Sequence, residues 1–98
     1  MPRVYIPNKS MHDFGPAEKW GELIFLTEGR VNTFKANDLA QVICEGMADS
    51  EPIDFVVLSG SPILSGLAMA KFAHRHGRVN LLIYNGVNYE SRQIVFPE

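Results

Sequence analysis

The chain contains a single cysteine, Cys44, which excludes an intrachain disulfide and any metal site built from several thiolates. Cys44 follows Val42 and Ile43 in a helical pattern, and no cationic side chain stands beside it. We therefore expect a buried, inert thiol rather than a nucleophile. His74 and His76 do not suggest a metal site either, because no cysteine or carboxylate accompanies them at ligand spacing.

Positive charge is scarce as well. Nine lysines and arginines stand against eleven aspartates and glutamates, for a formal net charge of -2, so the global basic character typical of nucleic-acid-binding proteins is missing. Long apolar runs are also missing: no stretch approaches the roughly 18 residues that cross a membrane, and the N-terminus has no apolar run of signal-peptide length. We expect a cytoplasmic protein, in a cell or an infected cell, without membrane attachment.

What remains is an ordinary globular composition, with 46% apolar and 20% charged residues. The length of 98 residues and the absence of a linker or repeat predict one α/β domain over residues 1–98. Apolar runs alternate with helical patterns along it. Strands are predicted at Arg3–Ile6, 22–27, 54–58 and 79–84, with a more polar last strand within 88–96, and helices within 36–47 and over Pro62–His76.

This alternation predicts parallel strands joined by right-handed crossovers. The expected fold is a small Rossmann-like α/β sheet with three or four parallel strands, an antiparallel C-terminal edge strand and two main helices. The runs at 22–27, 54–58 and 79–84 are continuously apolar, as in strands covered on both faces. Asn85-Gly86 predicts the hairpin that joins the last two strands. Residues 8–20 are the least regular, with one helical turn expected at 16–20.

The two helices carry different signals. The first has a single apolar stripe, formed by Leu39, Val42, Ile43, Gly46 and Met47. It begins near Lys35 or Asn37. The second begins at a natural N-cap, Ser61, with Pro62 in the favoured first position, and it ends at Gly77, which suits a left-handed cap.

The second helix is apolar on most sides. Its faces comprise Ile63, Leu67 and Ala70 on one side and Ser65, Met69 and Phe72 on another. Only Lys71 and Arg75 mark a clearly polar side, and a helix of this kind is usually buried on most sides. The sequence favours a homodimer through Pro62–His76. The alternative is that Phe14 and Trp20 cover the helix within one chain.

The carboxyl ends of parallel strands lie along one rim, where open α/β sheets bind their ligands. Each predicted strand runs into a small polar loop at that rim. The predicted ligand-binding residues are Ser59, Gly60, Ser61, Thr27, Glu28 and Asn85.

The Ser59-Gly60-Ser61 turn has two interpretations. Unpaired amides at a helix start, a glycine and two hydroxyls suit an anion such as a phosphate. Helix capping alone explains the same residues. The turn is not a Walker P-loop, because no Gly-Lys-Ser/Thr follows, and Gly60 and Gly66 lack the third glycine of a dinucleotide fingerprint. No cofactor is expected.

Catalysis would have to use side chains at the same rim. His12 beside Asp13 is the one pair that suggests general acid–base chemistry, although a plain surface histidine has the same pattern. Glu28 could be a base or a ribose contact, or a solvated turn residue. Lys9 and Arg30 are the rim cations that could neutralise a phosphate.

A basic cluster lies at the opposite rim, and it consists of Lys71, His74, Arg75, His76 and Arg78. Its position at the end of a helix complements the helix dipole. Nucleic-acid binding is disfavoured, because the cluster has no interleaved aromatic residues for stacking.

The strand–Ser-Gly-Ser–Pro–helix unit is similar to that of nucleotide-sensing Rossmann-like domains, such as the CARF type that binds cyclic oligoadenylates. The resemblance is one of fold and carries over no functional residue. Three functions stay open: a binding module for a phosphate-bearing ligand, above all a nucleotide; a metal-independent phosphodiesterase of ring-nuclease type using His12, Lys9 or Glu28; and a ligand-free oligomeric accessory protein of a virus or mobile element.

Overall fold

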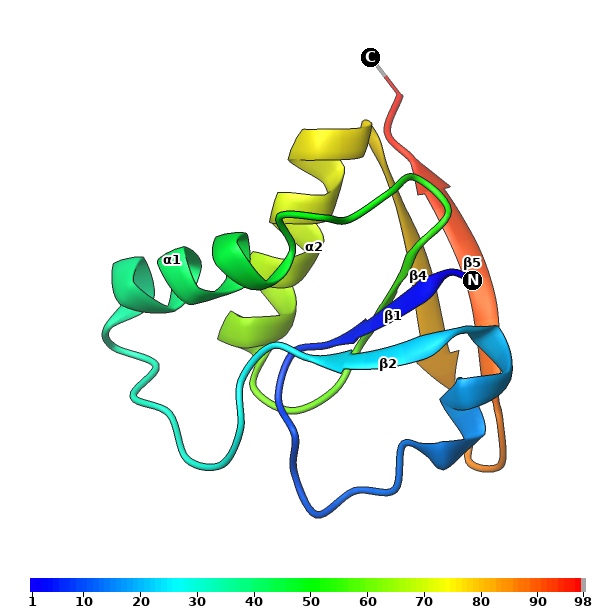
Figure 1. The fold of residues 1–98 in the computed structure, drawn as a ribbon, viewed down its shortest axis with the longest axis horizontal. Coiled ribbons are helices and arrows are strands. Elements are labelled where there is room, and N and C mark those ends of the chain that lie inside the picture. Colours follow the sequence, from blue (N-terminus) through cyan, green and yellow to red (C-terminus); the bar gives the residue numbers. More distant parts are fainter. Residues whose placement is uncertain (98) are drawn as a thin grey trace.

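Five strands form one sheet in the order β2–β1–β3–β4–β5 (Figure 1). The computed structural model describes residues 1–97. The strands are β1 (Arg3–Ile6), β2 (Glu22–Phe25), β3 (Phe55–Val57), β4 (Arg78–Tyr84) and β5 (Tyr89–Val95). The first four are parallel, and β5 pairs antiparallel with β4 from Arg78–Val95 to Tyr84–Tyr89. The predicted fold class and the predicted hairpin are confirmed.

Strand β2 departs from the prediction in length and in burial. It ends at Phe25 rather than Thr27, and its central residues, Leu23 and Ile24, are only half-buried. The reason is its place in the sheet: β2 is an edge strand, so it has a neighbour on one side only. Continuous apolar sequence therefore did not mean full coverage here.

Two helices cover one face of the sheet, as Figure 1 shows: α1 (Ala36–Gly46) and α2 (Pro62–His76). Both lie where the sequence predicts them. The Ser61 hydroxyl accepts a hydrogen bond from the Ile63 N–H (3.2 Å), and Gly77 takes the left-handed conformation with φ 75°. The core between helices and sheet contains Tyr5, Ile43, Met47, Val56, Leu64, Ala68 and Phe72.

The opposite face is covered by the 3-10 helix η1 (Gly15–Trp20) and the loop before it. Phe14 and Ala17 are buried there against Val4, Ile6 and other apolar side chains of β1, β3, β4 and β5. The alternative that Phe14 and Trp20 cover α2 is wrong, because α2 lies on the other side of the sheet. Its neighbours are α1, β3 and β4.

Helix α2 buries one stripe and exposes another. Leu64, Ala68 and Phe72, four residues apart, are completely buried, whereas Ile63 on the outer side is 44% exposed. Phe72 therefore belongs to the core, and the side of α2 on which it lies is not open to a partner.

The basic end of α2 fixes the loop between α1 and β3. The guanidinium of Arg75 donates to the Ala48 carbonyl, and that of Arg78 donates to the Pro52 carbonyl (3.1 Å). The Ser50 hydroxyl and His76 Nε2 share a hydrogen bond of 2.9 Å. Desolvation, helped by the charges of Arg75 and Arg78, holds the pKa of His76 below its usual range. This basic cluster thus has a structural role beyond the helix dipole.

Asp54 holds the other end of that loop. Its buried carboxylate accepts hydrogen bonds from the N–H groups of Arg3 and Glu51, both at 2.8 Å.

Cys44 is a correction to the sequence interpretation: its thiol is exposed, because it faces outward from α1 beside the buried Ile43. None of the helices in residues 1–97 has the length and hydrophobicity needed to span a bilayer.

Candidate functional site

A crevice opens where the sheet changes winding direction. The chain leaves β1 toward η1 on one face and leaves β3 toward α2 on the other, so the two loops diverge beyond the adjacent carboxyl ends of β1 and β3. Doubly wound sheets bind ligands at such a switch point. The pocket there has a volume of ≈ 320 Å³ and is lined by Ser10, His12, Leu58, Ser59, Gly60, Tyr84 and Tyr89.

The loop after β3 forms one wall of the crevice. Gly60 has φ 71°, the left-handed region that favours glycine, and an added Cβ would make an ordinary contact of 3.7 Å with the Asn8 Cβ. Ser61 is committed to capping α2. Ser59 uses its carbonyl to accept from the Ser65 hydroxyl (2.8 Å), but its own Oγ is buried and has no hydrogen-bond partner.

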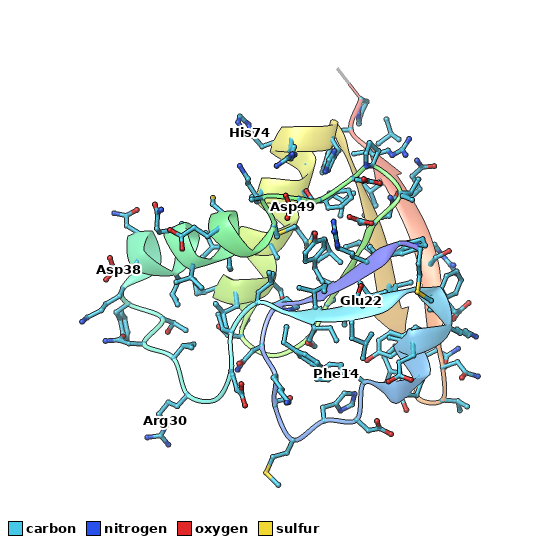
Figure 2. All side chains as sticks on the ribbon, viewed as in Figure 1. Phe14, Glu22, Arg30, Asp38, Asp49 and His74 are labelled. Atoms are coloured by element: carbon cyan, nitrogen blue, oxygen red, sulfur yellow. The ribbon has the colours of Figure 1, made fainter. Side chains whose placement is uncertain are left out.

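Aromatic rings form the opposite wall. The His12 ring stands edge-on to Phe14 and to Tyr84, with centroid distances of 5.1 and 5.5 Å, and Tyr84 contacts Tyr89 at 5.1 Å. Phe14, labelled in Figure 2, directly precedes η1 at the end of the loop that follows β1. The Tyr84 hydroxyl donates to the Gly86 carbonyl (3.0 Å), and its ring is 40% exposed. Burial raises the pKa of Tyr89.

Thr27 and Glu28 stay outside the crevice. The Thr27 hydroxyl donates to the carbonyl of Pro7 (2.7 Å) and lies 3.0 Å from Asn8 Oδ1, so it ties the end of β2 to the end of β1. The backbone of Glu28 pairs with that of Lys9 in an isolated parallel β-bridge, and Glu28 is exposed. These two predicted site residues are therefore one strand away from the pocket.

Asn85 is occupied by its own turn. Its side-chain oxygen accepts from the N–H groups of Val87 (3.0 Å) and Asn88 (2.9 Å), which shapes the hairpin loop between β4 and β5. It does not line the crevice.

The acid–base pair suggested by the sequence is not assembled. Asp13 Oδ1 accepts from the Gly15 N–H (2.9 Å) and so shapes the start of η1.

The two predicted rim cations lie outside the crevice. Lys9 lies over the Phe25 ring at 5.4 Å, in an adjoining pocket of ≈ 260 Å³ that shares Ser10 and His12 with the crevice. Arg30 is exposed on the β2–α1 loop and points away from the sheet (Figure 2). In residues 1–97 no group of three metal-ligating side chains comes together.

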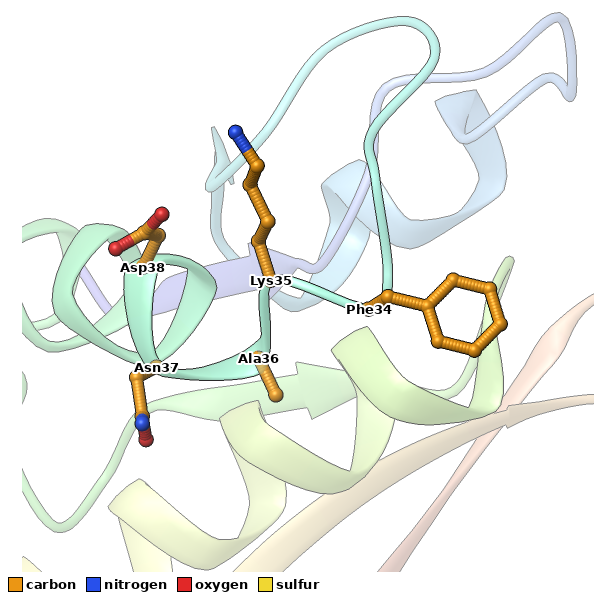
Figure 3. Close-up of a pocket in the computed structure, with 5 residues that line it drawn as sticks. All are labelled: Phe34, Lys35, Ala36, Asn37 and Asp38. Carbon is orange, nitrogen blue, oxygen red and sulfur yellow. The ribbon is translucent and has the colours of Figure 1, made fainter.

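A different pocket, of ≈ 270 Å³, lies at the start of α1 (Figure 3). Five consecutive residues form it, and the Phe34 ring is almost fully exposed and turned away from the helix. Because no second segment contributes, this hollow is a weaker candidate site than the crevice.

Sequence reasoning located the loop after β3 but missed the aromatic wall. Tyr84 ends one predicted strand and Tyr89 begins the next, and the register pairs them directly. Their positions on either side of a predicted hairpin were the available signal. Ser10 lies in the polar loop that follows the first predicted strand, at the rim where the sequence predicts ligand binding.

Comparison with known families supplies one match. The family described as phage Pam3 gp32-like protein matches residues 2–97. The chain belongs to this family. No curated protein and no solved structure gives a significant match. The membership agrees with the expectation of a small protein of viral origin.

Proposed function

We propose that the chain is a small binding module for a phosphate-bearing ligand, above all a nucleotide, held in the crevice between the β1 and β3 loops. The observation that carries the proposal is the crevice itself, at the winding switch of the sheet. Its volume of ≈ 320 Å³ lies at the lower end of small-molecule pockets, which suits a mononucleotide.

The two walls suit the two ends of such a ligand. Gly60 lets an oxyanion approach the backbone beside the positive end of the α2 dipole, and the Ser59 Oγ lacks a partner that a phosphate oxygen would supply after a turn about χ1. A planar base would stack on the exposed ring of Tyr84, near His12. Binding without catalysis is favoured over a phosphodiesterase, because the Asp13 carboxylate is engaged with Gly15 rather than His12.

A thermal-shift comparison of nucleoside 5′-monophosphates with the matching nucleosides tests the proposal. A ligand at about 100 times its dissociation constant adds about 2.7 kcal/mol of stability. We expect a rise in Tm with the monophosphates and a smaller one with the nucleosides. Tyr84→Ala should reduce the shift, whereas Ile83→Ala, its equally exposed neighbour on the other face of β4, should not. Equal shifts in the two variants would contradict the proposal.

A further inference from the structure

A second hollow lies between the two helices, and it is larger than the crevice. This α1/α2 groove has a volume of ≈ 410 Å³ and shares no residue with the crevice. It is lined by Ala40, Ile43, Cys44, Leu67, Ala70, Lys71 and His74. All but the last two are apolar or nearly so, and the groove belongs to the outer side of the helical layer.

The apolar lining continues along α2 beyond the groove. Ile63, Leu67 and Ala70 follow one another at helical spacing, and Ile63 is 44% exposed. Gly66 and Ala70 are small and exposed, so another backbone can come close. The outer side of α2 thus carries no charge before Lys71, although it faces solvent in the single chain.

The charged side chains of the two helices are divided by sign. Helix α1 carries Asp38 and Glu45 and no base, whereas α2 carries Lys71 and Arg75 and no acid. In the part of the chain that the structure describes, the only ion pair joins Arg92 to Glu90 on β5. Within residues 1–97, the acids of α1 and the bases of α2 therefore have no ionic partner, and of the bases Arg75 donates a hydrogen bond to the Ala48 carbonyl.

We infer that the α1/α2 groove binds a second copy of this chain, by a twofold contact that lays α1 of each copy on α2 of the other. Such a contact would bring each acidic helix against a basic one twice, and it would cover the apolar stripe. Self-complementarity favours a second copy over another protein, because a twofold interface places one surface against itself. A stable interface covers about 800 Å² per partner, about an eighth of the 6009 Å² surface, so the outer faces of both helices must take part.

Sedimentation velocity from micromolar to millimolar concentration tests this inference. The wild-type mass should rise from 11.0 kDa toward twice that value. Ala70→Glu should weaken association by about 100-fold or more, because it buries an unpaired charge in each copy. Val87→Glu is the control: the same new charge on an exposed residue of the β4–β5 hairpin loop, outside both helices, should leave association intact. Circular dichroism verifies that both variants are folded.

Charge reversal separates a second copy from any other partner. Glu45→Lys and Lys71→Glu should each weaken self-association, and the double variant should restore it. A mass that stays at 11.0 kDa up to millimolar concentration would overturn the inference. So would a dimer that Ala70→Glu and Val87→Glu affect equally, since the interface would then lie elsewhere. Neither outcome bears on nucleotide binding in the crevice.

Discussion

Two serines on either side of Gly60 should respond in opposite ways to the same substitution. Ser61 Oγ accepts the Ile63 N–H at 3.2 Å and caps a 15-residue helix. Ser59 Oγ is buried without any partner. If the fold alone selected these residues, both hydroxyls would stabilise it. If the crevice binds a ligand, the Ser59 hydroxyl contributes to binding but lowers the stability of the ligand-free protein.

The magnitudes follow from these contacts. Ser61→Ala removes a helix cap, which lowers the free energy of unfolding by about 1 kcal/mol. On folding, the Ser59 hydroxyl leaves water and forms no hydrogen bond within the protein. Ser59→Ala removes this hydroxyl, so it should raise the free energy of unfolding by about 1 kcal/mol, or leave it unchanged. For a domain of this size, a difference of 1 kcal/mol moves Tm by about 4–8 °C.

Urea denaturation followed by far-ultraviolet circular dichroism measures both changes, with Ser91→Ala on β5 as a control serine that does not line the crevice. Each variant is then titrated with a nucleoside monophosphate. We expect Ser59→Ala to be at least as stable as wild type and to bind more weakly. A loss of stability of about 1 kcal/mol in Ser59→Ala would refute the reasoning, because the hydroxyl would then be bonded in the native state.

Three further outcomes follow from the packing. Asp54→Asn should lower the free energy of unfolding in urea by about 2 kcal/mol, because an amide replaces the carboxylate that accepts two backbone N–H groups; an unchanged midpoint would contradict this. Gly66→Ala should raise the free energy of unfolding by about 0.5–1 kcal/mol, because Gly66 lies in mid-helix and the new methyl group has no atom within 4 Å. Gly21→Ala should destabilise the protein, because its Cβ would lie 2.2 Å from the Pro2 carbonyl oxygen. The lowered pKa of His76 means that its contribution to stability is complete above the ordinary value of 6.5 and is lost as the pH falls through the lower folded value; His76→Gln should flatten thermal stability against pH in that window, and equal slopes would argue against the assignment.

Local signals predicted most of the fold. The bounds of α2 follow from Ser61, Pro62 and Gly77, each of which fixes a terminus by its own chemistry. The sequence could not reveal that β2 takes the sheet edge, because its apolar run is the same whether one neighbour or two cover it. The outward position of Cys44 depends on where α2 packs against α1, which the helical pattern of α1 alone does not determine.

The candidate site was harder to predict than the fold. The rule that ligands bind at the carboxyl ends of parallel strands correctly predicted that Ser59 and Gly60 line the crevice. It also selected Thr27 and Asn85, whose side chains form local hydrogen bonds instead. Such bonds depend on the conformation of each loop. The place of the crevice also depends on the switch point, where the chain changes winding direction between β1 and β3. This switch point distinguishes one pair of neighbouring loops from the others at the same rim, and it can be located only when the strand order is known.

The most direct measurement of the central proposal is a nucleotide titration followed by ¹H–¹⁵N correlation spectra of the labelled protein. A nucleoside monophosphate should shift the amide signals of Gly60 and Ser59 first, together with those of His12 and Tyr84, because these residues line the crevice. Signals from the remote end of α2, such as that of His74, should stay in place. Shifts confined to that basic end, or none at millimolar nucleotide, would contradict a binding site at the switch point.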